Sequence, residues 1–201
     1  FFASSFQKAA ILTLDGVGEW ATASISYGVD NKITSIKELH FPHSPGLLYS
    51  AFTYFLGFKV NGGEYKLMGL APYGNPNDQQ VHEFKNIILS QLVDLKDDGS
   101  LWLNQSYFTF ATRLKMVDDK KWVKLFSVKK RNAEDPIEQV HCNLAYAIQA
   151  VIEMIVIKMA TEAQKATGAK QLCLAGGVAL NCVANGKLLE AGIFDQIYIQ
   201  P

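Results

Sequence analysis

The side chains with the clearest chemical potential lie in two glycine-containing turns. Asp15 ends an apolar run and is followed by Gly16, Val17, Gly18 and Glu19. Glycines let main-chain N–H groups converge into a nest for an anion. An acidic residue at the end of a strand suits a metal ion that bridges phosphate oxygens. Because Asp-Gly is also a common hairpin turn, the motif alone predicts either a phosphate site or a simple strand reversal.

The second turn joins a predicted strand to a predicted helix through Gly176 and Gly177, with Asn181 at the helix start. Helix N-termini attract phosphate through their exposed N–H groups and their dipole. Asn181 can cap the helix or reach a sugar or phosphate. The segment has neither a Walker GK[ST] nor a GxGxxG pattern, so nucleotide binding and a tight strand-to-helix turn both remain open.

A third segment places Glu64 and Lys66 two residues apart beside Gly63. It predicts either a lysine contact to phosphate or a surface ion pair of little energetic value. The four histidines show no mutual metal spacing. His82 and His141 are expected on helix surfaces without a role, and His43, ahead of a predicted helix, is the strongest candidate of the four.

The elements that must position these residues follow from the hydrophobic pattern. A buried strand pattern at 10–14, an alternating pattern at 20–27 and a third strand pattern at 33–41 predict an antiparallel meander. Ser44 as N-cap and Pro45 in the first turn predict a helix, which Gly57 ends. Another helix is expected at about 78–93.

The C-terminal half predicts helices that alternate with strands. Asp135 as cap, Pro136 at the first position and Glu138 three residues after the cap predict a long helix over 136–167. Strands follow at 171–175 and 197–199, with a helix at 181–190 between them. We expect one sheet containing the meander and both later strands, with the long helix on its face. We also expect Asp15 and Gly16 to lie close to Gly177 and Asn181.

Composition limits the classes of partner. The 201 residues are 49% hydrophobic, and 19 basic residues balance 19 acidic ones. This excludes disorder and argues against nucleic acid or a membrane as the main partner. Three cysteines without a close pair argue against disulfides and a CxxC zinc site, and predict a cytoplasmic location. The basic, aromatic stretch 120–131 is interpreted as a solvated connecting face rather than a binding patch.

Four motifs together resemble the carbamoyltransferases of the nodulation and antibiotic-biosynthesis type. They are residues 13–22 (TLDGVGEWAT), 41–54 (FPHSPGLLYSAFTY), 63–74 (GEYKLMGLAPYG) and 174–181 (LAGGVALN). The resemblance implies an α/β, ribonuclease-H-like (actin-like ATPase) subdomain, with a mixed sheet and packed helices. It also makes 1–201 the second ribonuclease-H-like half of such a domain, with an insert at about 78–134. The family is similar to the catalytic subunit that makes threonylcarbamoyladenosine in tRNA.

The resemblance also implies an activity and its residues. The family forms carbamoyl adenylate from carbamoyl phosphate and ATP, then transfers the carbamoyl group to a hydroxylated small-molecule acceptor. Asp15 is then a catalytic residue and a ligand of a divalent metal, Fe²⁺ or Mg²⁺, and Lys66 is a second catalytic residue. The implied nucleotide-binding residues are Gly16, Val17, Gly18, Glu19, Glu64, Gly176, Gly177 and Asn181.

Two features of the family pattern are missing from these 201 residues: an HxxxH histidine pair before them and a Gly-Asp-Ala-Gly aspartate after them. A separate C-terminal domain is missing too. We therefore expect the chain by itself to be inactive. Two alternatives remain: a stand-alone nucleotide-binding or interaction module, and a sugar-kinase-like phosphotransferase. The second is disfavoured because the sequence has no aspartate placed as the base that such a kinase needs. The acceptor is not predicted.

Overall fold

The computed structural model describes residues 1–200 and contains two compact units. The sheet unit comprises Phe1–Leu47, Leu95–Leu101 and the chain from Glu153 onward. The helical unit comprises Leu48–Asp94 and Trp102–Ile152.

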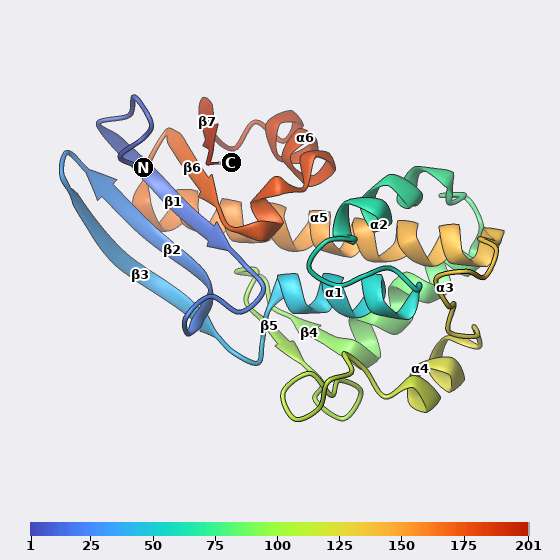
Figure 1. The fold of residues 1–201 in the computed structure, drawn as a ribbon. Helices are drawn as coiled ribbons and strands as arrows, with labels where there is room; N and C mark the ends of the chain where they lie inside the picture. The colour runs from blue at the N-terminus through green and yellow to red at the C-terminus, as the bar shows by residue number, and fades with distance from the viewer. Residues whose placement is uncertain (201) are drawn as a thin grey trace. The chain divides into compact units, whose positions relative to one another are not determined.

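The sheet unit contains one five-stranded mixed sheet in the order β3-β2-β1-β6-β7 (Figure 1). Its strands are β1 (Lys8–Leu14), β2 (Ala21–Val29), β3 (Lys32–His40), β6 (Gln171–Ala175) and β7 (Gln196–Ile199). The first three are antiparallel, whereas β6 runs parallel to β1 and to β7. This confirms that the meander and the two later strands share one sheet.

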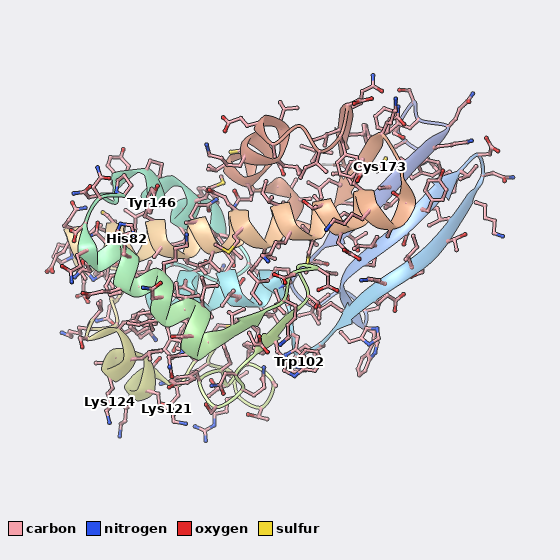
Figure 2. All side chains as sticks on the ribbon, turned by 180° about the vertical axis from the view of Figure 1, so that it is seen from behind. His82, Trp102, Lys121, Lys124, Tyr146 and Cys173 are labelled. Atoms are coloured by element: carbon pink, nitrogen blue, oxygen red, sulfur yellow. The ribbon has the colours of Figure 1, made fainter. Side chains whose placement is uncertain are left out.

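Both faces of the sheet are covered at β1 and β6, whereas β3 is largely exposed. On one face, the part of α5 (Gln139–Thr167) within the sheet unit brings Met159 to Leu12 and Ile25, around a cavity of about 340 Å³. The expected packing of the long helix on the sheet is therefore confirmed. On the other face, Cys173 (Figure 2) packs with Ile11 and the N-terminal segment.

The start of α5 corrects the sequence prediction. The helix begins at Gln139 rather than at 136. The Asp135 carboxylate accepts from the main chain and side chain of Asn132 instead of capping the helix. At the observed start the Glu138 N–H donates to His141 Nδ1 at 2.9 Å. Asp135 therefore closes a turn of its own, and the histidine replaces the predicted capping box.

The helical unit is built around aromatic side chains. Besides the first part of α5, it contains α2 (Glu64–Leu70), η1 (Ala71–Tyr73), α3 (Gln79–Ile87), a π-helical turn η2 (Ile88–Leu92) and α4 (Asp119–Phe126). Three elements are shared with the sheet unit: α1 (Pro45–Phe55), β4 (Val93–Leu95) and β5 (Leu101–Leu103). Trp122 is fully buried, with ring centroids of Phe52 and Phe55 at 4.7 and 5.3 Å. Such ring pairs add to the stability gained from buried area.

The basic stretch 120–131 serves this core in part. The side chains of Lys121 and Lys124 point outward from α4 (Figure 2), as the prediction of a solvated face requires. Trp122 and Arg131, however, are buried. The Arg131 guanidinium donates to the carbonyl of Leu56 just after α1, where a positive charge is favourable.

Among the described residues, α5 is the one helix long and apolar enough to cross a bilayer. In its most apolar window, 67% of the residues are buried inside the protein. That degree of burial is typical of a core helix. Of the three cysteines, Cys142 and Cys173 are buried and Cys182 is exposed, and none of them forms a disulfide.

Candidate functional site

Asp15 lies where the chain leaves β1, at the same sheet edge as the turn that follows β6. The two strands are parallel neighbours, with Thr13 paired to Ala175, so their carboxyl ends meet. Asp15 Oδ1 accepts from the N–H of Gly16 at 2.7 Å and of Gly177 at 3.4 Å. The expected proximity of Asp15 to Gly177 is confirmed. Within residues 1–200, Asp15 Oδ2 has no hydrogen-bond partner.

Gly176 is required for this junction. Its φ is +97°, and a Cβ there would overlap the carbonyl of Leu14. Only glycine combines this backbone conformation with such a close approach. At Gly177 a Cβ would lie 3.4 Å from Asp15 Oδ1, an ordinary contact distance. The glycine pair therefore lets the main chain cross the end of β1 beside the carboxylate.

Asn181 acts as a helix cap. Its Oδ1 accepts from the N–H of Ala184 at 3.0 Å, at the start of α6 (Cys182–Glu190). A 3₁₀ turn, η3 (Gly177–Leu180), lies between the glycines and the helix, which the sequence pattern did not predict. Of the two roles left open for Asn181, the structure shows capping, and contact with a sugar or phosphate remains a prediction.

The rest of the first turn faces solvent. Val17, Gly18 and Glu19 are exposed, and Gly18 has a φ of +58°. Nothing lies within 4 Å of a Cβ built on Gly16. The turn therefore leaves space for a ligand over Gly16 and beside Asp15.

Ser44 and Gly46 also contact the first turn, which the sequence analysis missed. The Ser44 hydroxyl donates to the main-chain carbonyl of Asp15, 2.9 Å away. A Cβ on Gly46 would lie 2.6 Å from the same carbonyl oxygen. Ser44 was predicted only as a helix cap. The sequence signal that could have revealed this contact was Gly46. Glycine favours a helix less than alanine does, so a glycine in the first helical turn indicates another requirement, such as close approach of a neighbouring segment.

The Glu64 carboxylate is hydrogen-bonded to neighbouring groups of the helical unit. Its two oxygens accept from the N–H groups of Asn61, Gly62 and Gly63 at 3.0–3.1 Å. The Ser50 hydroxyl donates to it at 2.8 Å. Burial alone raises the pKa of the Glu64 carboxyl, but these hydrogen bonds outweigh it and hold the pKa below its ordinary value of 4.5.

Lys66 is exposed and lies 5.9 Å from the ring centroid of its neighbour Tyr65. It forms no ion pair within residues 1–200. The surface ion pair with Glu64, one of the two alternatives, is therefore not formed, because Glu64 turns its carboxylate to the loop N–H groups. The lysine amine is left toward solvent, and a contact with phosphate remains a prediction.

The histidines differ from expectation in one case. His82 is exposed on α3, as predicted (Figure 2). His141 is 7% exposed rather than on a helix surface, and burial lowers its pKa. Its neutral ring accepts a hydrogen bond at the start of α5, so the prediction of an idle residue was wrong. Burial also lowers the pKa of His43.

The residues at the first turn can supply one ligand to a divalent metal ion. Across residues 1–200, no three His, Cys, Asp or Glu side chains come together as a metal site. Asp15 supplies one carboxylate with one oxygen unengaged. Hard cations require several oxygen ligands, so a metal held by Asp15 would take its other ligands from other groups.

The chain matches the carbamoyltransferase N-terminus family over residues 1–201. It belongs to that family. The chain is 53% identical, over all its 201 residues, to an uncharacterized protein (sll1178) of Synechocystis sp.. It is 34% identical to the nodulation protein NolNO of Sinorhizobium fredii and 32% identical to the nodulation protein NolO of Bradyrhizobium diazoefficiens, again over its whole length. The chain spans 32%, 27% and 33% of these three relatives.

Proposed function

We propose that this chain is the nucleotide-binding part of an ATP-dependent O-carbamoyltransferase in the cytoplasm. The reaction consumes carbamoyl phosphate, ATP and one water: carbamoyl phosphate is cleaved by the water to carbamate and orthophosphate, and the carbamate oxygen then displaces pyrophosphate from the α-phosphate of ATP to form carbamoyl adenylate. The carbamoyl group then passes to a hydroxyl of a small-molecule acceptor, and AMP leaves. The observation that carries the proposal is the junction of Asp15 with Gly177 at the carboxyl ends of β1 and β6, in a chain of this family.

In this proposal the two turns share the nucleotide. Gly16, Val17, Gly18 and Glu19 lie beside the phosphates and the carbamoyl adenylate, while Gly176, Gly177 and Asn181 line the pocket. Asp15 contributes one ligand to Fe²⁺ or Mg²⁺, and that ion would offset negative charge on the phosphate oxygens. Glu64 shapes the glycine loop before α2, and Lys66 presents its amine to an anionic group of a substrate.

The sheet supports a ribonuclease-H-like assignment. Three antiparallel strands are followed by parallel strands in the order β3-β2-β1-β6-β7, with α5 packed on one face. We propose that residues 1–201 form the second of two such halves in an actin-like ATPase arrangement. Residues 78–134 would be its insertion.

A second candidate is a nucleotide-binding module without catalysis. This candidate is favoured by the small number of metal ligands. The described residues supply only one evident ligand, which is too few to hold a catalytic metal ion by themselves. A sugar-kinase-like phosphotransferase would share the proposed nucleotide site but transfer phosphate. The three candidates differ in their products: the carbamoyltransferase forms AMP and pyrophosphate, the kinase forms ADP, and the module forms neither.

The test uses the full-length protein with ATP, a divalent metal, carbamoyl phosphate and a panel of hydroxylated sugars and antibiotics. We expect AMP and pyrophosphate to form only when carbamoyl phosphate is present, together with a carbamoylated acceptor detected by mass spectrometry. Asp15→Asn in the same protein should abolish this. Formation of ADP and a phosphorylated acceptor, or ATP binding without any product, would overturn the proposal.

A further inference from the structure

We propose that Ser44 is a positioning residue that fixes the Asp15 carboxylate for carbamoyl transfer by holding its main chain. The inference rests on the proposed function. It concerns a residue that would touch neither the nucleotide nor the acceptor.

The Ser44 hydroxyl makes two hydrogen bonds at once. It donates to the carbonyl of Asp15 at 2.9 Å and accepts from the N–H of Leu47 at 3.0 Å. The second bond is the N-cap of α1, and the first joins that cap to the turn after β1. Ser44 is 0% exposed, so water cannot readily replace either bond.

Gly46 tightens the same junction. A Cβ there would lie 2.6 Å from the Asp15 carbonyl oxygen and 2.7 Å from the Gly16 nitrogen. The first turn of α1 therefore packs directly against the peptide that joins Asp15 to Gly16. A serine hydroxyl and a bare glycine backbone hold this one peptide from the same side.

Together these contacts fix almost every polar group of Asp15. Its N–H donates to the carbonyl of Thr22 at 2.8 Å, and its own carbonyl accepts from Ser44. Oδ1 accepts from Gly16 and Gly177. Within residues 1–200 only its Oδ2 lacks a partner, and the direction of that oxygen is set by the other bonds. Such preorganisation matters at reacting groups, where a small displacement lowers the rate strongly.

Removal of the Ser44 hydroxyl should therefore loosen the turn at 15–18 without removing any group proposed to bind the nucleotide or the metal. In the full-length protein we expect Ser44→Ala to lower kcat about tenfold, the value of roughly one hydrogen bond, with the KM for the acceptor unchanged. Hydrogen exchange of the main-chain N–H groups of residues 15–20 should become faster. Ser44→Thr, which keeps a hydroxyl, should restore slow exchange and most of kcat.

The matched control is Asp118→Ala. The Asp118 side chain caps α4 by accepting from the N–H of Lys121, and alanine removes that cap. It should lower Tm to a similar extent but leave kcat and exchange at 15–20 unchanged. If Ser44→Ala does not fold, Gly46→Ala tests the same junction. It keeps the cap and crowds the Asp15–Gly16 peptide, and it too should lower kcat.

The positioning role is overturned if Ser44→Ala, or Gly46→Ala in its place, changes neither kcat nor exchange at 15–20 beyond the Asp118→Ala control. It is also overturned if Ser44→Thr behaves like Ser44→Ala in both measurements. Absence of carbamoyl transfer in the unmodified protein would instead contradict the proposed function. The hydrogen-exchange comparison would still decide whether Ser44 holds the turn.

Discussion

Two acidic glycine loops look alike in the sequence but differ in the structure. In the loop at 61–64, the Glu64 carboxylate accepts from three loop N–H groups and a serine, and both of its oxygens are engaged. In the turn at 15–18, Asp15 engages only Oδ1, with one short and one long hydrogen bond. In the loop at 61–64 the N–H groups therefore bind the protein's own carboxylate, whereas the turn at 15–18 leaves one carboxylate oxygen of Asp15 available to a ligand.

The difference follows from the order of the residues. Glu64 comes after its glycines and begins α2, so its side chain folds back over the N–H groups that precede the helix. Asp15 comes before its glycines and ends a strand. Its Oδ1 therefore accepts from the N–H of Gly16 in its own turn and from that of Gly177 in the neighbouring turn, and Oδ2 is not used by the loop. An acid beside glycines indicates a ligand site only when the local main chain leaves one of its carboxylate oxygens without a partner.

The largest effect on stability is expected at Gly176. Alanine there would combine a φ of +97° with overlap against the carbonyl of Leu14, so we expect the free energy of unfolding to fall by roughly 3 kcal/mol. Chemical denaturation measures it. The control is Gly186→Ala in α6, where a Cβ meets nothing within 4 Å and should stabilise the protein by about 0.5–1 kcal/mol. Equal effects of the two substitutions would contradict the close crossing.

Glu64→Ala should give the next largest effect. It removes the acceptor of three loop N–H groups and of the Ser50 hydroxyl, and we expect a loss of about 2 kcal/mol in the free energy of unfolding. Asp15→Ala, which removes an acceptor for only two N–H groups, should lose about 1 kcal/mol or less. Denaturant titration of both variants tests the contrast, and a larger loss for Asp15→Ala would break it.

The Glu64 loop should also give the protein a pH dependence. The pKa of Glu64 is lowered in the folded state, so its charge stabilises the protein above about pH 4.5, the ordinary value. This contribution is lost as the pH falls through the lowered pKa. We expect the stability difference between the unmodified protein and Glu64→Gln to be full at pH 6 and to shrink below pH 4.5. A difference that is independent of pH would show that the charge has no part in closing the loop.

Lys66→Ala should have the smallest effect on stability. The side chain is exposed and unpaired within the described residues, so the free energy of unfolding should change by no more than about 0.5 kcal/mol. If Lys66 has the proposed catalytic role, kcat/KM of the full-length enzyme should still fall at least about tenfold. Unchanged activity would remove Lys66 from the catalytic set.

Much of the fold could be predicted because local signals and packing agree. The hydrophobic pattern predicted the strands of the sheet, and the predicted caps Ser44 and Asn181 are both observed. The closeness of Asp15 to Gly177 was expected because one nucleotide would use both turns, and the structure produces it by pairing β1 with β6 in parallel. These features depend on short-range patterns that tertiary contacts support.

The misses have tertiary causes. The predicted cap Asp135 bonds to Asn132, and buried His141 takes over the helix start, a choice that depends on what surrounds the ring. The local partners of Glu64 were not predicted either: Asn61 has a left-handed backbone, with a φ of +61°, in a loop that closes on the carboxylate, and the role of Glu64 at a nucleotide stays a prediction. The role of Ser44 at Asp15 joins residues 29 apart, which spacing does not reveal.

The most direct test is calorimetric titration of the full-length protein with ATP in the presence of Mg²⁺ or Fe²⁺, for the unmodified form, Asp15→Asn and Glu64→Gln. The open turn should be the ligand site, so Asp15→Asn should lower metal-dependent ATP affinity at least about tenfold without changing Tm by more than a few degrees. Glu64→Gln should lower Tm more and ATP affinity less. Unchanged ATP affinity in Asp15→Asn, beside a large loss in Glu64→Gln, would contradict the account.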